Sequence, residues 1–340
     1  MAKKKGEGSP SRQRYLVTGG AGFLGSHLSE RLLADGHEVI AFDDLSTGKL
    51  DNLQPLEGNP RFDYVIESVT NEPLLQNIIN DVDAVFHLAA GVGMVNVVRS
   101  PVTTLENTLY PTELVLNCAA MAGKCRVLIA SSAEVYGKAE KTPLSEEDEL
   151  VLGAPGKPRW SYGCAKAVGE YLAVAYHAER KLPVVVARLF NTAGPRQTGD
   201  YGMVVPRFVM QAVKGGPITV YGDGVQSRCF LHVSDAVDAL RGLLGCRKAE
   251  GQVVNVGSDE ETSINELAER VRGRVNPQAE IVHVPYNEAY GEGFEDPRRR
   301  VPDLSRLKRL TGFQPAKTLD DIIDDVAEEC RSRKRKIDKL

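Results

Sequence analysis

One short stretch near the N-terminus decides the fold: Tyr15-Leu16-Val17-Thr18-Gly19-Gly20-Ala21-Gly22-Phe23-Leu24-Gly25-Ser26-His27. It places Gly19, Gly22 and Gly25 three residues apart, after a short apolar run and at the start of a helical pattern. In this context one glycine permits a tight turn, one lets a pyrophosphate approach the backbone, and one lets a helix pack closely on a strand. The N-terminus of the helix adds free N–H groups and the positive end of a dipole. The stretch therefore predicts a strand–turn–helix unit that binds a dinucleotide.

The acidic residue that usually accompanies such a loop stands at the end of the next predicted strand. Residues 38–42 have a strand pattern that ends at Asp43-Asp44, about 20 residues after the loop. The Asp43 carboxylate can accept hydrogen bonds from the adenosine ribose hydroxyls, and it would repel a 2′-phosphate. The sequence therefore favours NAD over NADP as the cofactor.

Strands and helices alternate through the first half of the chain. We expect strands at 15–18, 38–42, 84–88, 126–130 and 183–188, and helices at 22–35, 105–121 and 160–180. This alternation predicts an α/β fold with a Rossmann-type doubly wound parallel sheet. After Asn191 glycine and proline become frequent and the segments shorten, which indicates a smaller C-terminal α/β substrate-binding domain.

The same pattern gives the expected domain boundaries, and the composition gives the expected setting. We assign 13–190 plus 236–260 to the NAD-binding domain, 191–235 plus 261–330 to the substrate-binding domain, and 1–12 and 331–340 to charged tails. The net charge of −4 argues against a general nucleic-acid binder, and no apolar run predicts a membrane partner or a secretory signal. Six scattered cysteines without a CxxC pair fit a reduced, cytoplasmic protein.

A second constellation lies inside Arg159-Trp160-Ser161-Tyr162-Gly163-Cys164-Ala165-Lys166. Tyr162 and Lys166 are four residues apart, so they share one face of the predicted helix. A lysine ammonium beside a phenol favours the phenolate, so we expect the pKa of Tyr162 to fall towards the range of a general base. Ser132 follows the predicted strand 126–130 and is placed to hydrogen-bond the hydroxyl that loses its proton. These three residues are the catalytic candidates.

Eight motifs, in this order, resemble those of the extended short-chain dehydrogenase/reductases, the NAD-dependent nucleotide-sugar epimerases, dehydratases and decarboxylases. They are TGGAGFLGSH, DDLSTG, FHLAA, SSAEVYG, YGCAK, ARLFNTAGPR, VYGDGVQSRCFLHVSD and NVGS, and they extend over nearly the whole chain. The resemblance implies that Tyr162 takes the proton of a sugar 4-hydroxyl while C4 gives a hydride to NAD⁺, which leaves a transient 4-keto sugar. We expect cofactor contacts from Gly19, Gly22, Phe23, Leu24, Gly25, Asp43, Asp44, Leu88, Ala89, Ala90, Asn107, Tyr162 and Lys166.

Three reactions share this first step, and the residues after Ser132 bear on the choice. Dehydratases that resemble this chain carry an Asp–Glu pair where this chain has Ala133 and Glu134, so no obvious acid is left to protonate the leaving 6-hydroxyl. Glu134 matches the Thr-Ser-Glu of decarboxylases and is a further catalytic candidate, whereas Ser132-Ala133 is similar to galactose-type epimerases. We expect a 4-epimerase of a UDP-hexose or UDP-hexuronic acid. The alternative is a UDP-glucuronate decarboxylase, and a 4,6-dehydratase is less favoured.

The resemblance also implies where the nucleotide sugar binds. Arg300, in YGEGFEDPRRRVPD, occupies the place of an arginine in bacterial UDP-glucuronate decarboxylases, and KPRWSY, which contains Arg159, is also similar to that group. Arg300 could hold a carboxylate by a bidentate pair or could neutralise the diphosphate. We expect Arg228 to bind the diphosphate, Arg196 to face the sugar end, and Asn191 to contact the sugar or the diphosphate.

The sequence also indicates which other functions and partners to expect. An NAD-binding regulator without turnover is disfavoured by the intact Ser132, Tyr162 and Lys166, and a plain sugar dehydrogenase would release its NADH. We expect no metal site, because His27, His87 and His232 are far apart in the sequence. By analogy we expect a homodimer through the helices at 105–121 and 161–180.

Overall fold

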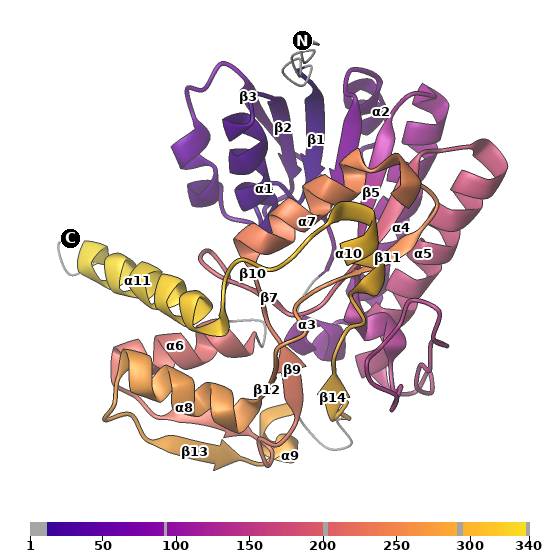
Figure 1. Cartoon of the computed structure of the whole chain (residues 1–340). Helices are drawn as coiled ribbons and strands as arrows, with labels where there is room; N and C mark the ends of the chain where they lie inside the picture. Colours follow the sequence, from indigo (N-terminus) through magenta and orange to yellow (C-terminus); the bar gives the residue numbers. More distant parts are fainter. Residues whose placement is uncertain (1–11, 92–93, 200–202, 291–294, 338–340) are drawn as a thin grey trace, which may run out of the picture.

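The computed structural model describes residues 12–91, 94–199, 203–290 and 295–337. Its centre is a seven-stranded parallel sheet in the order β11-β6-β5-β4-β1-β2-β3 (Figure 1). The strands are β1 (Arg14–Thr18), β2 (Glu38–Asp43), β3 (Phe62–Ile66), β4 (Ala84–His87), β5 (Arg126–Ser132), β6 (Val184–Leu189) and β11 (Val253–Val256). The chain runs outward from β1 first to one edge and then to the other. This is the doubly wound arrangement, so the predicted fold class is confirmed.

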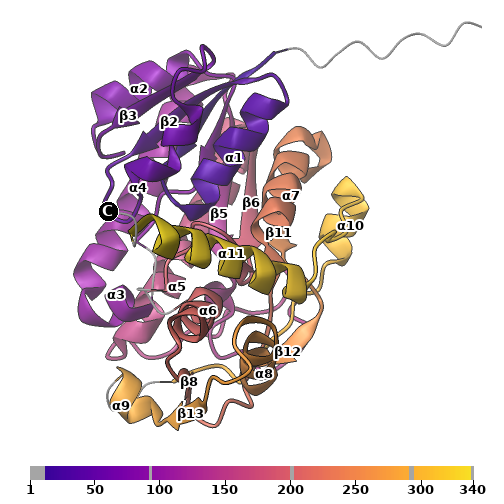
Figure 2. The ribbon, with the colours of Figure 1, turned by 90° about the vertical axis from the view of Figure 1, so that its left-hand side faces the viewer.

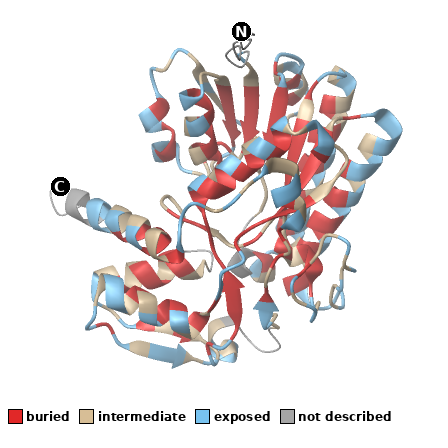
Figure 3. Ribbon diagram, viewed as in Figure 1, coloured by how far each residue is buried: buried red, intermediate tan, exposed pale blue. Residues whose placement is uncertain are grey.

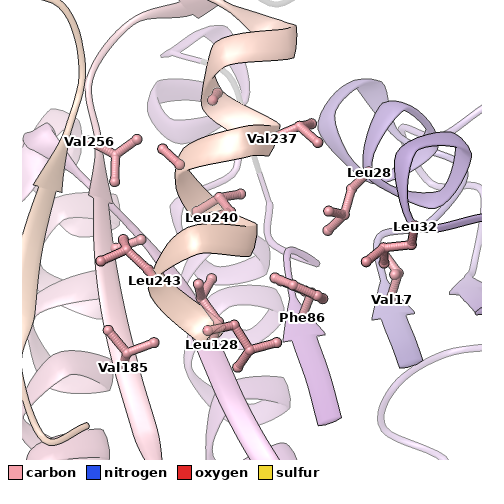
Figure 4. Packing of buried hydrophobic residues seen from close by; sticks show 14 of the residues in the cluster. Val17, Leu28, Leu32, Phe86, Leu128, Val185, Val237, Leu240, Leu243 and Val256 are labelled. Carbon is pink, nitrogen blue, oxygen red and sulfur yellow. The ribbon is translucent and has the colours of Figure 1, made fainter. Parts of the chain in front are cut away.

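Helices cover both faces of this sheet (Figures 1 and 2). On one face lie α1 (Phe23–Ala34) and α7 (Val233–Gly245), and on the other lie α2 (Glu72–Asn80), α4 (Pro101–Ala122) and α5 (Ser161–Arg180), with the short α3 (Met94–Arg99) before α4. Figure 4 shows the first layer, where Leu28 of α1 and Leu240 of α7 pack on Val17, Phe86 and Leu128 of the strands. Because both faces are covered, the central strands are buried along nearly their whole length, as Figure 3 shows.

A smaller region lies beyond the carboxyl ends of the strands (Figures 1 and 2). It contains β8 (Ile218–Tyr221) paired with β13 (Ile281–Val284), and β12 (Glu261–Ser263), β9 (Ser227–Cys229) and β14 (Arg299–Arg300) in one three-stranded sheet. Its helices are α6 (Val204–Lys214), α8 (Ile264–Val275), α9 (Tyr286–Tyr290) and α11 (Leu319–Ile337). Phe208 of α6, Leu267 of α8 and Ile322 of α11 are fully buried in a core of their own. A short parallel pair, β7 (Thr192–Ala193) and β10 (Leu231–His232), lies between the two regions.

The structure differs from the predicted domain boundaries and tails in two places. Residues 305–311, assigned from the sequence to the smaller domain, form α10 (Ser305–Thr311), which packs on α7 and β11 because Leu307 belongs to the core beneath α7. Residues 331–337, expected to be a tail, continue α11 up to Ile337. The expected tail 1–12 lies outside the described residues except for Arg12. No helix within the described ranges has the length and apolarity that crossing a bilayer requires.

Candidate active site

The glycine loop occupies the junction between β1 and α1. Gly19 has φ +69°, a conformation that side chains rarely adopt, and a Cβ at Gly25 would collide with the carbonyl oxygen of Gly19. Gly22 precedes the first residue of α1 in an extended conformation, and no side chain caps the N–H groups of that helix. The loop therefore presents bare backbone and a helix N-terminus to the space above the sheet, as a pyrophosphate site requires.

Asp43 supports this loop from the end of β2. Its carboxylate accepts hydrogen bonds from the N–H of Ala21 at 2.9 Å and from the N–H of Leu45 at 2.8 Å. Burial raises the pKa of Asp43, and these backbone bonds oppose the effect. Asp43 lines the cavity and is bonded to the loop, so the residue predicted to read the ribose hydroxyls also holds the shape of the glycine turn.

A single cavity of about 520 Å³ joins the glycine loop to the smaller region. It is lined by every site residue that the sequence analysis proposed: Gly19, Gly22, Phe23, Leu24, Gly25, Asp43, Asp44, Leu88, Ala89, Ala90, Asn107, Ser132, Glu134, Arg159, Tyr162, Lys166, Asn191, Arg196, Arg228 and Arg300. The parallel sheet explains this convergence, because the carboxyl ends of its strands open at one edge. The roles of these site residues within the cavity stay predictions.

The catalytic candidates meet where β5 and α5 face each other. Ser132 ends β5, and Tyr162 and Lys166 lie on the first two turns of α5. The Lys166 Nζ lies 5.8 Å from the centroid of the Tyr162 ring and donates a hydrogen bond to the Ala130 carbonyl oxygen at 2.7 Å. The lysine is buried and tied to the strand, so its position relative to the phenol is fixed.

The electrostatics of this pair differ from the prediction. Burial raises the pKa of Tyr162 well above its ordinary value, the negative charge of Glu134 raises it further, and a hydrogen bond with Ser132 lowers it. Burial also lowers the pKa of Lys166 to about 8. The expected fall of the Tyr162 pKa is therefore wrong for the protein by itself, because the cost of placing a phenolate in this buried site exceeds the benefit of the nearby ammonium.

Glu134 lies in the cavity wall between two buried arginines. It follows Ser132 in the 3₁₀ turn η3 (Ala133–Tyr136) and accepts a hydrogen bond from Arg159 Nη1 at 2.7 Å. Arg300 donates to both carboxylate oxygens, one of them at 3.0 Å. Burial alone would raise the pKa of Glu134, but Arg300 and Arg159 hold it well below its usual range. Glu134 is therefore a fixed anion and a poor proton donor near neutral pH.

The arginine run that contains Arg300 divides into three environments. Arg298 pairs with Asp223 and Arg299 pairs with Glu261, and both arginine side chains are more than half exposed. Arg300 is 5% exposed, and its Nε has no hydrogen-bond acceptor among the described residues. Only the third arginine of this run thus projects its guanidinium into the cavity wall.

The diphosphate candidate Arg228 lies beside Arg300, because β9 and β14 pair with Arg300 opposite Arg228. Its Nη2 donates to the Asp296 carboxylate at 2.7 Å, and the Tyr286 hydroxyl donates to the other oxygen of that carboxylate at 3.2 Å. Asp296 is also 3.9 Å from Arg159. The sequence analysis missed Asp296 and Tyr286, although the acidic pair Glu295-Asp296 directly before Pro297 was a visible signal.

The other two proposed substrate contacts, Asn191 and Arg196, also have protein partners. Asn191 donates to the Cys229 carbonyl oxygen at 3.3 Å. The Arg196 guanidinium pairs with Glu30 of α1 at 2.6 Å, and its backbone N–H donates to Glu329 of α11. Arg196 thus pairs with α1 while it also lines the cavity, and its expected place at the sugar end stays a prediction. The neighbouring Pro195 carbonyl contacts His27 of the same helix.

The histidines have local partners, and no metal-binding group of three or more His, Cys, Asp or Glu side chains is present within the described ranges. His87 lies between the hydroxyls of Thr18 and Thr112, and burial lowers its pKa to about 3. His232 caps the start of α7 through Ser234. Cys164, on the catalytic helix, is exposed and free.

Known proteins resemble this chain over most of its length. Residues 16–326 match the family model described as GDP-mannose 4,6 dehydratase. The UDP-N-acetyl-alpha-D-glucosaminuronate decarboxylase of Bacillus cytotoxicus is 40% identical over 305 residues, which cover 89% of this chain and 93% of that protein. UDP-glucuronic acid decarboxylase 1 of Xenopus tropicalis is 37% identical over 310 residues, which cover 91% of this chain and 70% of that protein.

A solved structure agrees with these relatives. The UDP-glucuronic acid 4-epimerase of Bacillus cereus in complex with NAD aligns with a TM-score of 0.81 and 28% identity, over 94% of this chain and 99% of that chain. Fold and site together define a short-chain dehydrogenase/reductase type of enzyme. Within that class, the chain belongs to the NAD-dependent nucleotide-sugar epimerase, dehydratase and decarboxylase family, as its motifs predict.

The cofactor of this family fits the residues present. The loop at Gly19, Gly22 and Gly25 presents backbone to the cavity and has no room for a Cβ at Gly25, and Asp43 would supply the carboxylate for the ribose hydroxyls. Tyr162 and Lys166 line the same cavity as this loop. The predicted NAD dependence is in agreement with the family assignment.

Proposed function

We propose that this chain decarboxylates a UDP-hexuronate through transient oxidation at C4. The observation that carries the proposal is the convergence of Arg159 and Arg300, both buried, on Glu134 in the cavity wall near Tyr162. A guanidinium fork matches a carboxylate bidentately, and Arg300 keeps an unpaired Nε N–H among the described residues. Glu134 already binds both arginines, and the carboxylate of a hexuronate would add a second anion beside two cations, which a neutral hexose lacks.

The residues divide the work of the oxidation. Bound NAD⁺ would accept the hydride from C4 and later return it. Tyr162 takes the proton of the 4-hydroxyl, and Ser132 hydrogen-bonds the same oxygen as it becomes a carbonyl. Lys166 contributes a positive charge that favours the deprotonated phenol. Because the pKa of Tyr162 is raised in the protein alone, this step depends on positive charge in the filled site.

The 4-keto group prepares the loss of CO₂. The C5 carboxylate is then β to a carbonyl, so the electrons of the C5–C6 bond can move into an enolate whose oxygen lies at C4 as CO₂ leaves. C5 then takes a proton from water, which gives a 4-keto pentose to which the hydride is returned at C4, with the proton held by Tyr162 going to the C4 oxygen. Ser132 and Tyr162 are placed to stabilise that oxygen, and Arg300 to orient the carboxylate. Glu134 binds both arginines and, as a fixed anion, has no proton to give for an elimination of water.

The 4-epimerase that the sequence analysis preferred is not favoured over this alternative. Ser132-Ala133 and the structural likeness to the Bacillus cereus 4-epimerase speak for epimerisation. The more similar relatives are named as decarboxylases, and Glu134 with Arg300 suits a reaction that needs a held carboxylate. Epimerisation therefore remains as a distinct outcome of the test.

Mass spectrometry with three substrates tests the proposal. We expect UDP-glucuronate or UDP-N-acetylglucosaminuronate to lose the mass of CO₂ with catalytic NAD⁺, and UDP-glucose to stay unchanged. A product of unchanged mass with a new C4 configuration would indicate epimerisation. Net accumulation of NADH with excess NAD⁺ would indicate a plain dehydrogenase. No reaction with any of the three would refute both the decarboxylase and the epimerase.

We also infer a homodimer in the cytoplasm. Large apolar side chains are exposed along α4 and α5, which pack side by side: Val102, Tyr110, Met121, Val168, Tyr171 and Val174. An apolar surface of this extent on two neighbouring helices is typical of a helical interface. All six cysteines are free, which suits a reducing compartment. Light scattering should give twice the chain mass, and Tyr171→Glu, 72% exposed in the single chain, should give the monomer mass.

A further inference from the structure

A third residue continues the catalytic stripe of α5. Tyr162, Lys166 and Glu170 are spaced by four residues, so their side chains share one face of the helix. Lys166 and Glu170 are each 5% exposed. A buried glutamate is rare unless it is paired, and the reaction proposed above gives Glu170 no direct part. Its contacts therefore need an explanation of their own.

Glu170 holds the ends of two neighbouring strands. Ser131 donates to its Oε1 at 2.5 Å, directly before the catalytic candidate Ser132. Arg188 of β6 binds it bidentately, with Nε 2.9 Å from Oε1 and Nη2 2.7 Å from Oε2. Ser131 and Arg188 are register partners on β5 and β6. One carboxylate thus fixes the carboxyl end of β5 relative to β6 and to the helix that carries Tyr162.

The same contact reaches the turn that carries Glu134. The guanidinium of Arg188 lies over the ring of Tyr136, 4.7 Å from its centroid. Tyr136 is the last residue of η3, it is 1% exposed, and its hydroxyl donates to Asn255 at 2.7 Å. Ser132 and Glu134 therefore lie within one backbone segment, 131–136, that Glu170 supports at both ends. Glu170 contacts Ser131 directly, and it contacts Tyr136 through Arg188.

We propose that Glu170 is a positioning residue for C4 oxidation, which sets Ser132 and η3 against the Tyr162–Lys166 stripe and keeps Lys166 in its charged form. This inference rests on the proposed function only for the reaction step that it serves. A buried ion pair by itself adds little net stability compared with apolar residues of similar volume. The contacts to the active-site segments, and not stability alone, are what this arrangement supplies.

The charge environment of Lys166 supports the second part of the proposal. Burial lowers the pKa of Lys166 to about 8, and the negative charge of Glu170 acts in the opposite direction. The other ionisable groups near it are Tyr162 on α5, His87 of β4, which is neutral, and Arg188 of β6, whose charge Glu170 neutralises. Loss of the Glu170 charge would remove the negative charge that opposes the effect of burial, so the lysine would release its proton at lower pH.

Three variants of Glu170 separate these contributions. Glu170→Gln removes the charge and Glu170→Asp keeps it. The double variant Glu170→Gln with Arg188→Met removes both members of the ion pair, so that no unpaired Arg188 charge is left buried and the protein can still fold. Glu179→Gln, an exposed glutamate on the same helix, is the control. We expect Glu170→Gln to lose turnover with the KM for the nucleotide sugar little changed. In its pH–rate profile, the pH at which turnover has fallen by half on the alkaline side should decrease by about one unit. This corresponds to a tenfold change in the proton-dissociation constant. Glu170→Asp should return this pH towards its native value. The double variant also lacks the Glu170 charge, so it should show the same decrease together with a reduced kcat.

A measurement without substrate keeps this inference separate from the proposed function. The Lys166 titration can be followed by NMR of ¹³C-labelled lysine in the protein without nucleotide sugar, with Lys166→Arg used for assignment. The midpoint should fall in Glu170→Gln and stay in Glu179→Gln. If the native protein turns over no UDP-sugar while this midpoint moves as expected, the proposed function fails alone. If the midpoint of Glu170→Gln and the kcat of the folded double variant are both native, the inference about Glu170 is overturned.

Discussion

The two ends of the cavity differ in the chemical groups that line them. The cofactor end consists of backbone and one carboxylate: the turn at Gly19, Gly22 and Gly25, with Asp43 bonded to its N–H groups. The sugar end consists of buried charges, with Arg159 and Arg300 on Glu134 and Arg228 on Asp296. The first end can therefore be predicted from residues that are close together in the sequence. The second end is formed by residues that come together only in the folded chain.

The largest effect should come from the residue that serves both ends. Tyr162→Phe removes the proton acceptor and leaves the packing of the ring, so we expect turnover to fall by about 10²–10⁴-fold. NAD binding and UDP binding should stay near native values. Calorimetry of both ligands together with the product assay checks this. Tyr171→Phe, an exposed tyrosine on the same helix, is the control, and an active Tyr162→Phe would remove the phenol from the mechanism.

A charge at the sugar end gives the next largest effect. Arg300→Met should lower kcat/KM for a UDP-hexuronate by about 100-fold, because charge-assisted hydrogen bonds contribute about 1.5–3 kcal/mol each. The affinity for UDP should change much less, since Arg228 stays in place. Arg298→Met, which removes an exposed arginine two residues earlier, should leave both values unchanged. Equal losses in the two variants would mean that the run acts only through its total charge.

The cofactor end should respond to shape and not to charge. Gly25→Ala places a methyl group against the Gly19 carbonyl oxygen, and overpacking of this kind costs about 1–3 kcal/mol. We expect NAD affinity to fall by about 10- to 100-fold while the sugar end stays intact. Titration with NAD measures it, and Gly156→Ala, where a Cβ meets no atom within 4 Å, is the control. Native NAD affinity in Gly25→Ala would show that the loop is not the phosphate site.

The smallest effect is a pH dependence at the junction of the two ends. Lys166 must be protonated to favour the phenolate, and burial lowers its pKa to about 8. Activity should therefore fall as the pH rises above about 8, by about tenfold per unit once the lysine is neutral. A pH–rate profile measures this. A profile that stays flat up to pH 10 would exclude a role for the lysine charge.

Much of the fold and of the cofactor end could be predicted from the sequence. The order of strands and helices, the glycine spacing and Asp43 are local features, and parallel sheets impose few alternatives on such a pattern. Tyr162 and Lys166 were also predicted to lie together, because a helix fixes their spacing. The predicted pKa of Tyr162 was wrong because burial is a property of the folded chain and does not appear in a motif.

The sugar end could be predicted only in part. Glu134 and Arg300 are 166 residues apart in the chain, and their bidentate contact depends on β14 pairing with β9. The acidic pair Glu295-Asp296 was visible in the sequence, but its contact with Arg228 was not, and neither was the pairing of Arg196 with Glu30 of α1. The support of β5, β6 and η3 by Glu170 could not be predicted for the same reason, since it joins three separate segments: 126–136, α5 and β6.

The most direct test follows the carboxylate that the sugar end is built to hold. The protein is incubated with NAD⁺ and UDP-glucuronate, or its 2-acetamido analogue, carrying ¹³C at C6, and the label is followed by NMR. The account predicts that the label leaves the sugar as CO₂ and bicarbonate while a UDP-pentose accumulates. A label that remains on a sugar with an inverted C4 would contradict decarboxylation and would assign the buried arginines to binding alone.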